Sequence, residues 1–281
     1  MGHTRLMPSP FAAQCVATLQ QLGVPVDDVI DTGAQNCVVL TNEGATVHRF
    51  PRFDPERLPE VIARYERISE LGLPTAEMVA VTHGEPGVAH LVLRRETGTP
   101  WREAIAQIDT VGRQRAAQQI AELLQQCRTV TVTDWPFANL SWLRMWSGLQ
   151  TQLANPPRQA EVSAVDHQHV ADALATAEQA PMGLIHGDLA WGNILLSDVG
   201  DITAVLDWDF AVIADPAIDV AAVLYDVPPD MTAAFAEVHT HVDADLKRFD
   251  RYLATWDLQH RLWQHEAPSD LRPPHSVETA H

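Results

Sequence analysis

The sequence predicts an α+β fold, with short strands gathered in the first third of the chain and helices in most of the rest. Strand-like segments and a hairpin turn precede residue 97, and helical patterns dominate after it. One further apolar hairpin interrupts the helices between residues 194 and 206. With 281 residues, the chain is long enough for one large domain or for two lobes with sizeable cores.

Composition excludes several classes of protein. The formal net charge is −18, and between Arg158 and Lys247 the chain holds 16 acidic residues and no Lys or Arg. Nucleic-acid binding needs a basic surface, so we expect no nucleic-acid partner. No apolar run reaches the ~18–20 residues that span a bilayer, and no signal peptide is visible, so we expect a cytoplasmic protein with no membrane partner. Three scattered cysteines without CxxC spacing argue against disulfides and against a zinc site.

The first elements are expected to be a helix followed by strands. Ser9 and Pro10 predict a helix start, and an apolar stripe continues until Gly23. A second helix, with an apolar face, is predicted over residues 58–68. A hairpin turn is expected at residues 42–44. The predicted strands lie at residues 29–30, 37–40, 45–50 and 90–93.

Helical patterns fill most of the chain after Thr99-Pro100, which we expect to begin a new helix. The composition changes near residue 97, and we expect one lobe at 1–97 and another at 98–267. The Pro-rich tail at 268–281 is expected to be disordered. His239 and His241 are expected on a solvated helix face rather than at a metal. The expected helical segments are residues 105–124, which Gly112 could break, 135–149, 170–177 and 231–263.

One block of the sequence carries the chemistry. His186-Gly187-Asp188 is followed, four residues later, by Asn193, and an apolar strand over residues 202–206 ends on Asp207. Apolar runs on both sides of a polar turn predict a β-hairpin, whose open end would bring Asp188, Asn193 and Asp207 together. Two acids and an amide suit a hard cation such as Mg²⁺. The chemistry to expect is phosphoryl transfer, in which an Asp accepts the proton of the attacking hydroxyl.

With Trp208 and the Asp215-Pro216-Ala217-Ile218-Asp219 run, this block resembles the catalytic segment of the aminoglycoside phosphotransferase family. That family is related to the protein kinases and includes aminoglycoside, macrolide and choline kinases. The resemblance covers roughly residues 25–265 and implies a two-lobed protein-kinase-like fold. A small β-rich N-terminal lobe would bind ATP or GTP with Mg²⁺. A larger, mainly helical C-terminal lobe would carry catalysis and the substrate.

The resemblance implies a role for each matching residue. Asp188 would be the catalytic base, and Asn193 and Asp207 would hold Mg²⁺. Arg49 stands where the family usually has Lys and would contact the phosphates, paired with Glu60 or, as the alternative, Glu66. The remaining matches are Gly33 in a phosphate loop, Arg95 and Thr97 at the nucleobase, and His186, Asp215 and Asp219 as supports of the catalytic loop. From the residues alone, Asp215 could equally be only a helix N-cap.

The acidic interval bears on the acceptor. It is either a solvated, solubilising surface or a basin that concentrates a cationic substrate. We predict an amine-bearing antibiotic, inactivated as a means of resistance: an aminoglycoside first, a macrolide or basic peptide second. Asp209, Asp226 and Asp230 are the expected substrate-binding acids. The alternatives are a metabolic kinase like those for choline or homoserine, a hydrolase with water as acceptor, and a non-catalytic nucleotide-binding protein. We expect a monomer or a weak homodimer.

Overall fold

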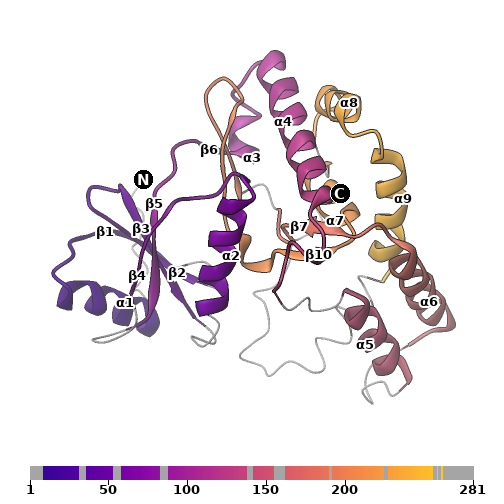
Figure 1. The fold of residues 1–281 in the computed structure, drawn as a ribbon, viewed down its shortest axis with the longest axis horizontal. Coiled ribbons are helices and arrows are strands. Elements are labelled where there is room, and N and C mark those ends of the chain that lie inside the picture. Colours follow the sequence, from indigo (N-terminus) through magenta and orange to yellow (C-terminus); the bar gives the residue numbers. More distant parts are fainter. Residues whose placement is uncertain are drawn as a thin grey trace. The chain divides into compact units, whose positions relative to one another are not determined.

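The computed structural model describes residues 9–31, 36–52, 58–82, 88–137, 142–154, 162–189, 192–224, 227–255, 258 and 261. The chain divides into two compact units, each of which is assembled from separate stretches of sequence. The first comprises Met1–Leu123, Asp188–Ala211 and Pro228–Phe235. The second comprises Leu124–Gly187, Val212–Val227 and Ala236–His281. Strands and helices are both present, as the predicted α+β class requires (Figure 1).

A five-stranded antiparallel sheet is the frame of the first unit (Figure 1). The predicted strands and the turn at residues 42–44 are confirmed. The turn residues Asn42, Glu43 and Gly44 all have positive φ, which suits a tight hairpin. The strand at Met78–Thr82 was not predicted, since its residues do not alternate between buried and exposed. In sheet order the strands are β1 (Val26–Ile30), β2 (Asn36–Thr41), β3 (Thr46–Pro51), β5 (His90–Arg94) and β4 (Met78–Thr82).

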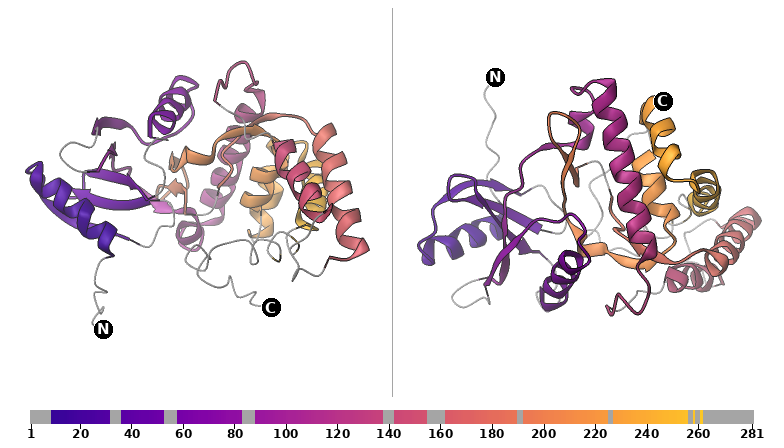
Figure 2. Two further views of the ribbon diagram at one scale, coloured as in Figure 1. Left: turned by 90° about the horizontal axis from the view of Figure 1, so that it is seen from below. Right: turned by 45° about the horizontal axis from the view of Figure 1, so that its top comes forward.

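Two helices cover opposite faces of this sheet, as all three ribbon views show (Figure 2). Helix α1 (Pro10–Gln21) begins at Ser9, whose Oγ accepts the backbone N–H of Ala12 at 3.2 Å, and packs on the face that carries Phe50. Helix α2 (Leu58–Glu70) packs on the other face. Because side chains alternate along a strand, Arg49 of β3 lies on the α2 face.

The predicted late hairpin is confirmed as part of a small three-stranded sheet in the first unit. Its strands, in sheet order, are β6 (Thr99–Pro100), β8 (Ile194–Leu196) and β9 (Ile202–Val205). The helical segment at residues 105–124 was wrong at its start: α3 (Trp101–Ala104) ends early, and α4 (Thr110–Thr129) follows. Gly112 does not break a helix but lies in the first turn of α4. A Cβ on Gly200, in the hairpin turn, would lie 2.2 Å from the carbonyl oxygen of Gly112, so this contact requires glycine.

The second unit is mainly helical, with one two-stranded sheet. Helices α5, α6 and α9 share an apolar core that includes Leu149, Val170 and Tyr252. The predicted helix at 135–149 was wrong at its start: Trp135 is buried outside any helix, with its ring 4.8 Å from that of Phe137. The elements are α5 (Trp142–Ala154), α6 (Ala164–Gln179), β7 (Gly183–Ile185), β10 (Val212–Ala214), α7 (Ala217–Leu224) and α9 (Val242–Leu253); α8 (Pro229–Val238) begins in the first unit and ends in the second.

His239 lies between α8 and α9 and was placed wrongly by the sequence. It is 1% exposed, and its Nε2 lies 2.7 Å from a carboxylate oxygen of Asp245, so it belongs to the interior rather than to a solvated face. Among the described residues, no group of three or more His, Cys, Asp or Glu is arranged to hold a metal. The three cysteines are buried and unbridged. No helix in the described ranges has the length and apolar character needed to cross a membrane.

Candidate active site

The β8–β9 hairpin brings Asn193 and Asp207 to the same end of its two strands. Ile194 is opposite Val205, and the backbone N–H of Leu206 donates to the carbonyl of Asn193 at 2.7 Å. Asp207 is therefore one residue beyond the last inter-strand bond. Its backbone is left-handed, with φ 64° and ψ 57°, a conformation uncommon for residues other than glycine. The hairpin and the following 3₁₀ turn η2 (Trp208–Phe210) hold this strained position, as is frequent at functional sites.

Asn193 is joined to Asp188 by its side-chain amide. The Nδ2 group donates to the backbone carbonyl of Asp188 at 2.8 Å and lies 3.4 Å from its carboxylate. Partial desolvation raises the pKa of Asp188, the negative charge of Asp207 raises it further, and the hydrogen bond from Asn193 acts in the opposite direction. The three residues predicted to converge therefore do so within the first unit.

Arg49 is the basic residue of this cluster and is 7% exposed. Both of its terminal nitrogens donate to Asp209, at 3.1 and 3.0 Å, in a two-pronged ion pair. Nη2 also donates to Asp207 at 2.9 Å, and Nη1 donates to the hydroxyl of Tyr65 at 2.6 Å. Burial would lower the pKa of Arg49, but Tyr65, Asp209 and Asp207 outweigh it, and the net direction is upward. The guanidinium is thus held as a cation.

Glu60 does not pair with Arg49 in this structure. Its carboxylate accepts a short hydrogen bond from Arg64, one helical turn further along α2. Arg64 also donates to the backbone carbonyl of Asp209. Glu66, the alternative partner, is exposed on the same helix. The physical reason is that the terminal N–H groups of Arg49 already meet acceptors from Tyr65, Asp207 and Asp209, while Arg64 lies at the ideal spacing for Glu60.

The remaining residues that were predicted to contact the nucleotide or the acceptor make the following contacts. Arg95 is exposed, and its backbone N–H donates to Ala45 at 3.0 Å. The carbonyl of Thr97 accepts the hydroxyl of Thr203 at 2.5 Å. Two acids expected at the acceptor each pair with an arginine: Asp209 with Arg49, and Asp230 with Arg113 at 3.1 Å. Gly33 and Asp226 lie outside the described residues.

The oxygen atoms at the hairpin end fit a hard cation. The amide nitrogen of Asn193 faces Asp188, which leaves its Oδ1 available as a ligand. One carboxylate oxygen of Asp207 accepts from Arg49, the other makes no hydrogen bond within the described part of the chain, and the side chain is 31% exposed. Oxygen donors and few protein ligands are what Mg²⁺ uses beside substrate phosphates.

In the second unit, Asp219 supports the segment that leads directly into Asp188. Its two carboxylate oxygens accept the backbone N–H groups of His186 at 2.6 Å and of Gly187 at 3.1 Å. Gly187 has φ 81°, which favours glycine at the second position of His-Gly-Asp. The His186 side chain is buried. This is the backbone support that the family resemblance implied for Asp219.

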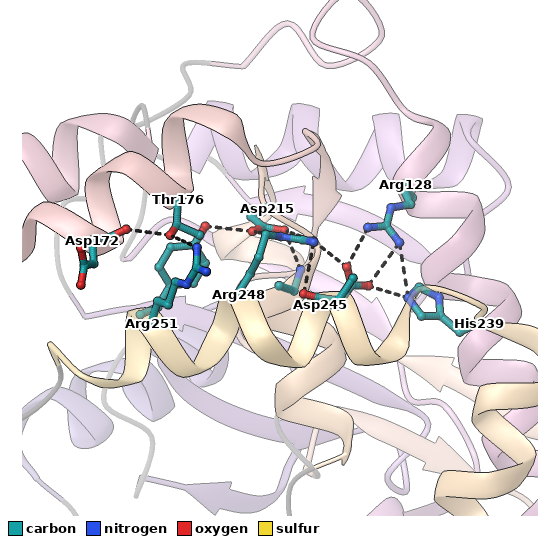
Figure 3. A network of polar contacts seen from close by, with 11 residues as sticks. Arg128, Asp172, Thr176, Asp215, His239, Asp245, Arg248 and Arg251 are labelled. Atoms are coloured by element: carbon teal, nitrogen blue, oxygen red, sulfur yellow. Dashed lines mark hydrogen bonds and ion pairs between the residues drawn. The ribbon is translucent and has the colours of Figure 1, made fainter. Parts of the chain in front are cut away.

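Asp215 is fully buried at the start of α7 and caps it, since its carboxylate accepts the backbone N–H of Ala217 at 3.0 Å. The same carboxylate accepts two bonds from Arg248, at 2.8 and 2.9 Å, and one from the hydroxyl of Tyr252. Arg248 also bonds Asp245, so that a continuous polar network runs along α9 (Figure 3). Asp215 is therefore more than a helix cap.

Two residues of the cluster in the first unit were missed by the sequence analysis. Tyr65 was assigned to the apolar face of its helix, and Arg64 received no role. Tyr65 does pack in the core, but its hydroxyl reaches Arg49. Arg64 is 6% exposed. An arginine beside the apolar stripe of an otherwise amphipathic helix was the available signal, since arginine is rarely buried without a partner.

The fold and the site together define a phosphotransferase with a kinase-like architecture. The family model described as "Phosphotransferase enzyme family" matches residues 29–257, and the chain belongs to this family. It is thus a phosphotransferase enzyme. A search of the curated proteins gives no match.

Solved structures of similar fold include antibiotic phosphotransferases. An ADP-bound aminoglycoside phosphotransferase APH(2″)-Ib has a TM-score of 0.71 at 12% identity, covering 92% of each chain. The GDP complex of aminoglycoside 2′-phosphotransferase-IIIa has a TM-score of 0.69 at 16% identity, covering 88% of this chain and 90% of the other. A macrolide 2′-phosphotransferase of type I has a TM-score of 0.64 at 14% identity, covering 95% and 100%. The likeness confirms the kinase-like fold.

Proposed function

We propose that this enzyme transfers the γ-phosphate of ATP or GTP to a hydroxyl of a small cationic molecule, with Mg²⁺ as the metal. The observation that carries this proposal is the cluster in the first unit, where a carboxylate, a cation site and a buried guanidinium come together. The cluster consists of Asp188, Asn193, Asp207 and Arg49. Phosphoryl transfer depends mainly on positioning and on charge stabilisation, which these groups supply.

Asp188 is proposed as the base that orients and deprotonates the acceptor hydroxyl. Its raised pKa makes it a stronger base than an ordinary aspartate. The amide of Asn193 fixes the backbone at Asp188. In the second unit, Asp219 accepts the backbone N–H groups of His186 and Gly187, the two residues that precede Asp188. Asp215, which accepts the backbone N–H of Ala217, and the buried His186 are proposed to support the same segment.

Asn193 and Asp207 would hold Mg²⁺ through their oxygen atoms. The cation, when bound, would neutralise charge that develops on the transferring phosphoryl group. Arg49 would act on the nucleotide phosphates, in place of the lysine usual in such enzymes. Gly33, Arg95 and Thr97 remain proposed nucleotide contacts, and Glu60 would act indirectly, by fixing Arg64. The nucleotides in the similar solved structures, GDP, ADP and ATP, support a nucleotide as the phosphate donor.

The acceptor is proposed to be an amine-bearing antibiotic, an aminoglycoside first and a macrolide or basic peptide second. Two observations support this. The chain has no Lys or Arg between Arg158 and Lys247 but 16 acids, which favours a cationic ligand. Similar solved structures hold kanamycin and streptomycin, at 16% and 13% identity. Asp226 and Asp230 remain candidate contacts for the amines, and modification of the drug would give resistance.

The test is a transfer assay with the purified enzyme, Mg²⁺ and either ATP or GTP. The acceptor panel would contain aminoglycosides, macrolides, basic peptides, choline, homoserine and anionic sugars, with mass spectrometry detecting the gain of one phosphoryl group. We expect product with an aminoglycoside and little nucleotide turnover in its absence. Nucleotide hydrolysis that no acceptor accelerates would instead identify a hydrolase, and product only with anionic or neutral alcohols would exclude the cationic acceptor.

A further inference from the structure

The principal counter-ion of the Arg49 guanidinium is Asp209, which lies on the η2 turn after β9 and not on helix α2. Asp209 engages both terminal nitrogens, at 3.1 and 3.0 Å, whereas Asp207 engages one. The side chains are 8% exposed for Arg49 and 18% for Asp209. A buried, two-pronged arginine–carboxylate pair fixes both the position and the plane of the guanidinium.

Both members of this ion pair, Arg49 and Asp209, are also hydrogen-bonded to residues of helix α2. Tyr65 of α2 receives one N–H from Arg49 at 2.6 Å, and Arg64 of α2 donates to the backbone carbonyl of Asp209. Nη1 thus meets Tyr65 and Asp209, and Nη2 meets Asp207 and Asp209, which accounts for all four terminal N–H groups. The Nε–H is the one guanidinium donor that these four bonds do not use.

A bound metal would change how much of the Arg49 charge each of the two carboxylates, Asp207 and Asp209, compensates. Asp207 has an open oxygen at the proposed Mg²⁺ site, so a cation there would draw on its charge. Asp209 would then be the main counter-charge for a guanidinium that is almost completely removed from water. Without it, the cation would be buried with insufficient compensation.

We propose that Asp209 is a positioning residue that holds Arg49 for the nucleotide phosphates, in the place expected of Glu60, and that Tyr65 assists it. This inference rests on the proposed function of Arg49. It also explains why an arginine can stand at this position. Lys would meet the fork of acceptors with a single ammonium, whereas Arg matches two carboxylate oxygens side by side. Asp209 is thereby assigned to the nucleotide side of the reaction rather than to the acceptor.

The experiment is a double-mutant cycle on Mg–nucleotide binding, measured by titration calorimetry with Mg–ATP and Mg–GTP. Asp209→Asn keeps the size of the side chain but removes one acceptor and the charge. We expect it to raise the nucleotide Kd about 10-fold, as for loss of a hydrogen bond to a charged group. In the Arg49→Ala background the same substitution should change Kd less than about 2-fold, because its partner is gone.

Three further variants separate positioning from general damage. Asp201→Asn removes another aspartate that pairs with an arginine in the same unit, Arg115 at 3.9 Å, and should leave Kd unchanged. Tyr65→Phe removes one hydroxyl and should raise Kd by a smaller factor, without loss of thermal stability. Glu60→Gln should weaken nucleotide binding less than Asp209→Asn does.

The result that would overturn the inference is specific. If Asp209→Asn leaves nucleotide Kd unchanged and raises only the KM of the acceptor, Asp209 contacts the substrate. If its effect persists undiminished in the Arg49→Ala background, it does not act through Arg49. Failure of every acceptor in the panel would overturn the proposed function alone, since the nucleotide Kd would still decide this inference.

Discussion

Asp188 combines two properties that follow from its surroundings. The negative charge of Asp207 and partial desolvation disfavour the ionised carboxylate, so its pKa is raised. A raised pKa strengthens the base but makes the folded protein less stable wherever the group is ionised. If Asp188 is the base, as proposed, its surroundings would favour reactivity and disfavour stability, and both effects can be measured.

We predict that Asp188→Asn lowers kcat by about 10²–10⁴-fold, because the amide cannot accept the hydroxyl proton. Nucleotide binding should survive. The sign for stability is opposite to the usual Asp case: a folded pKa above the unfolded value of ~4 destabilises the protein at pH 7 and not below pH ~4. Thermal unfolding of the variant at pH 7 should therefore show an equal or higher Tm. Near-normal turnover would exclude Asp188 as the base.

The proposed role of Asp207 as a metal ligand can be tested by removing its carboxylate. Asp207→Ala should abolish Mg²⁺-dependent nucleotide binding and activity together, since the metal would keep only one proposed protein ligand. If calorimetry showed unchanged Mg–nucleotide binding by this variant, Asp207 would not be a metal ligand but only an acidic residue at the end of a strand.

For Arg49, we predict severe loss of activity in Arg49→Ala and a measurable remainder in Arg49→Lys. Lysine keeps the positive charge but cannot form the fork with Asp209. Steady-state kinetics on both variants would check this order. Parental kinetics in Arg49→Ala would place phosphate positioning elsewhere.

Helices α7 and α9 are joined by buried charges rather than by apolar contacts alone. Arg248 of α9 bonds Asp215 at the start of α7, and also Asp245 of its own helix. Asp245 further accepts from Arg128 at 2.9 Å and meets Nε2 of His239 (Figure 3). Burial would raise the pKa of Asp245, but His239, Arg128 and Arg248 outweigh it and lower the pKa. Since α7 carries Asp219, this network stabilises the element that supports the His186–Gly187 backbone.

We predict that Arg248→Met lowers the free energy of unfolding by roughly 3–5 kcal/mol, as for the breaking of a buried ion pair. Denaturant titration would measure it. The matched control is Arg251→Met on the same helix, whose partner is the neutral hydroxyl of Thr176 at 3.1 Å and whose loss should be much smaller. Equal losses in the two variants would mean that the buried charges contribute nothing specific.

The pH dependence of this network has a definite sign. Asp245 has a lowered folded pKa, so its contribution to stability is present above the unfolded pKa of ~4 and is lost as the pH falls further. The stability difference between the parent and Asp245→Asn should therefore shrink on acidification below pH 4. A difference that stays constant from pH 7 to pH 3 would contradict this assignment.

Some of the acidic residues of the chain form ion pairs with arginines within the protein. Asp209, Asp230 and Asp245 each pair with an arginine, so they add less to a surface potential than the sequence suggested. A net charge of −18 nevertheless remains, and it acts on any charged ligand that approaches. Long-range attraction of this kind is screened by salt over a Debye length of ~10 Å at 0.1 M.

We predict that the KM of the cationic acceptor rises clearly between low and high ionic strength, while the KM of the nucleotide changes less. Initial rates at several salt concentrations, with kcat followed in parallel, would measure both. A best acceptor that is anionic or uncharged, with a KM independent of salt, would show that the acidic composition serves only solubility.

The kind of fold and the convergence of Asp188, Asn193 and Asp207 could be predicted from the sequence, for a local reason. Asp188, Asn193 and Asp207 lie within one hairpin and its approach, and the pairing of two apolar runs across a short turn already brings them together. The same holds for the Ser9 cap of α1 and the turn at Gly44, where nearby residues decide the backbone.

The partners of the charged groups depended on the tertiary structure, because they come from distant parts of the chain. Arg49 reaches Asp209 across 160 residues of sequence, and Arg128 reaches Asp245 across 117. The family resemblance pointed to Glu60 as the partner of Arg49, but Arg64 pairs with Glu60 instead. An arginine on β3 finds its acceptors only when β3, α2 and η2 are packed. The sequence shows that a carboxylate is present but not which group it will pair with. Packing decides the partner, because a buried charge is stable only when an opposite charge or hydrogen-bond donors compensate it.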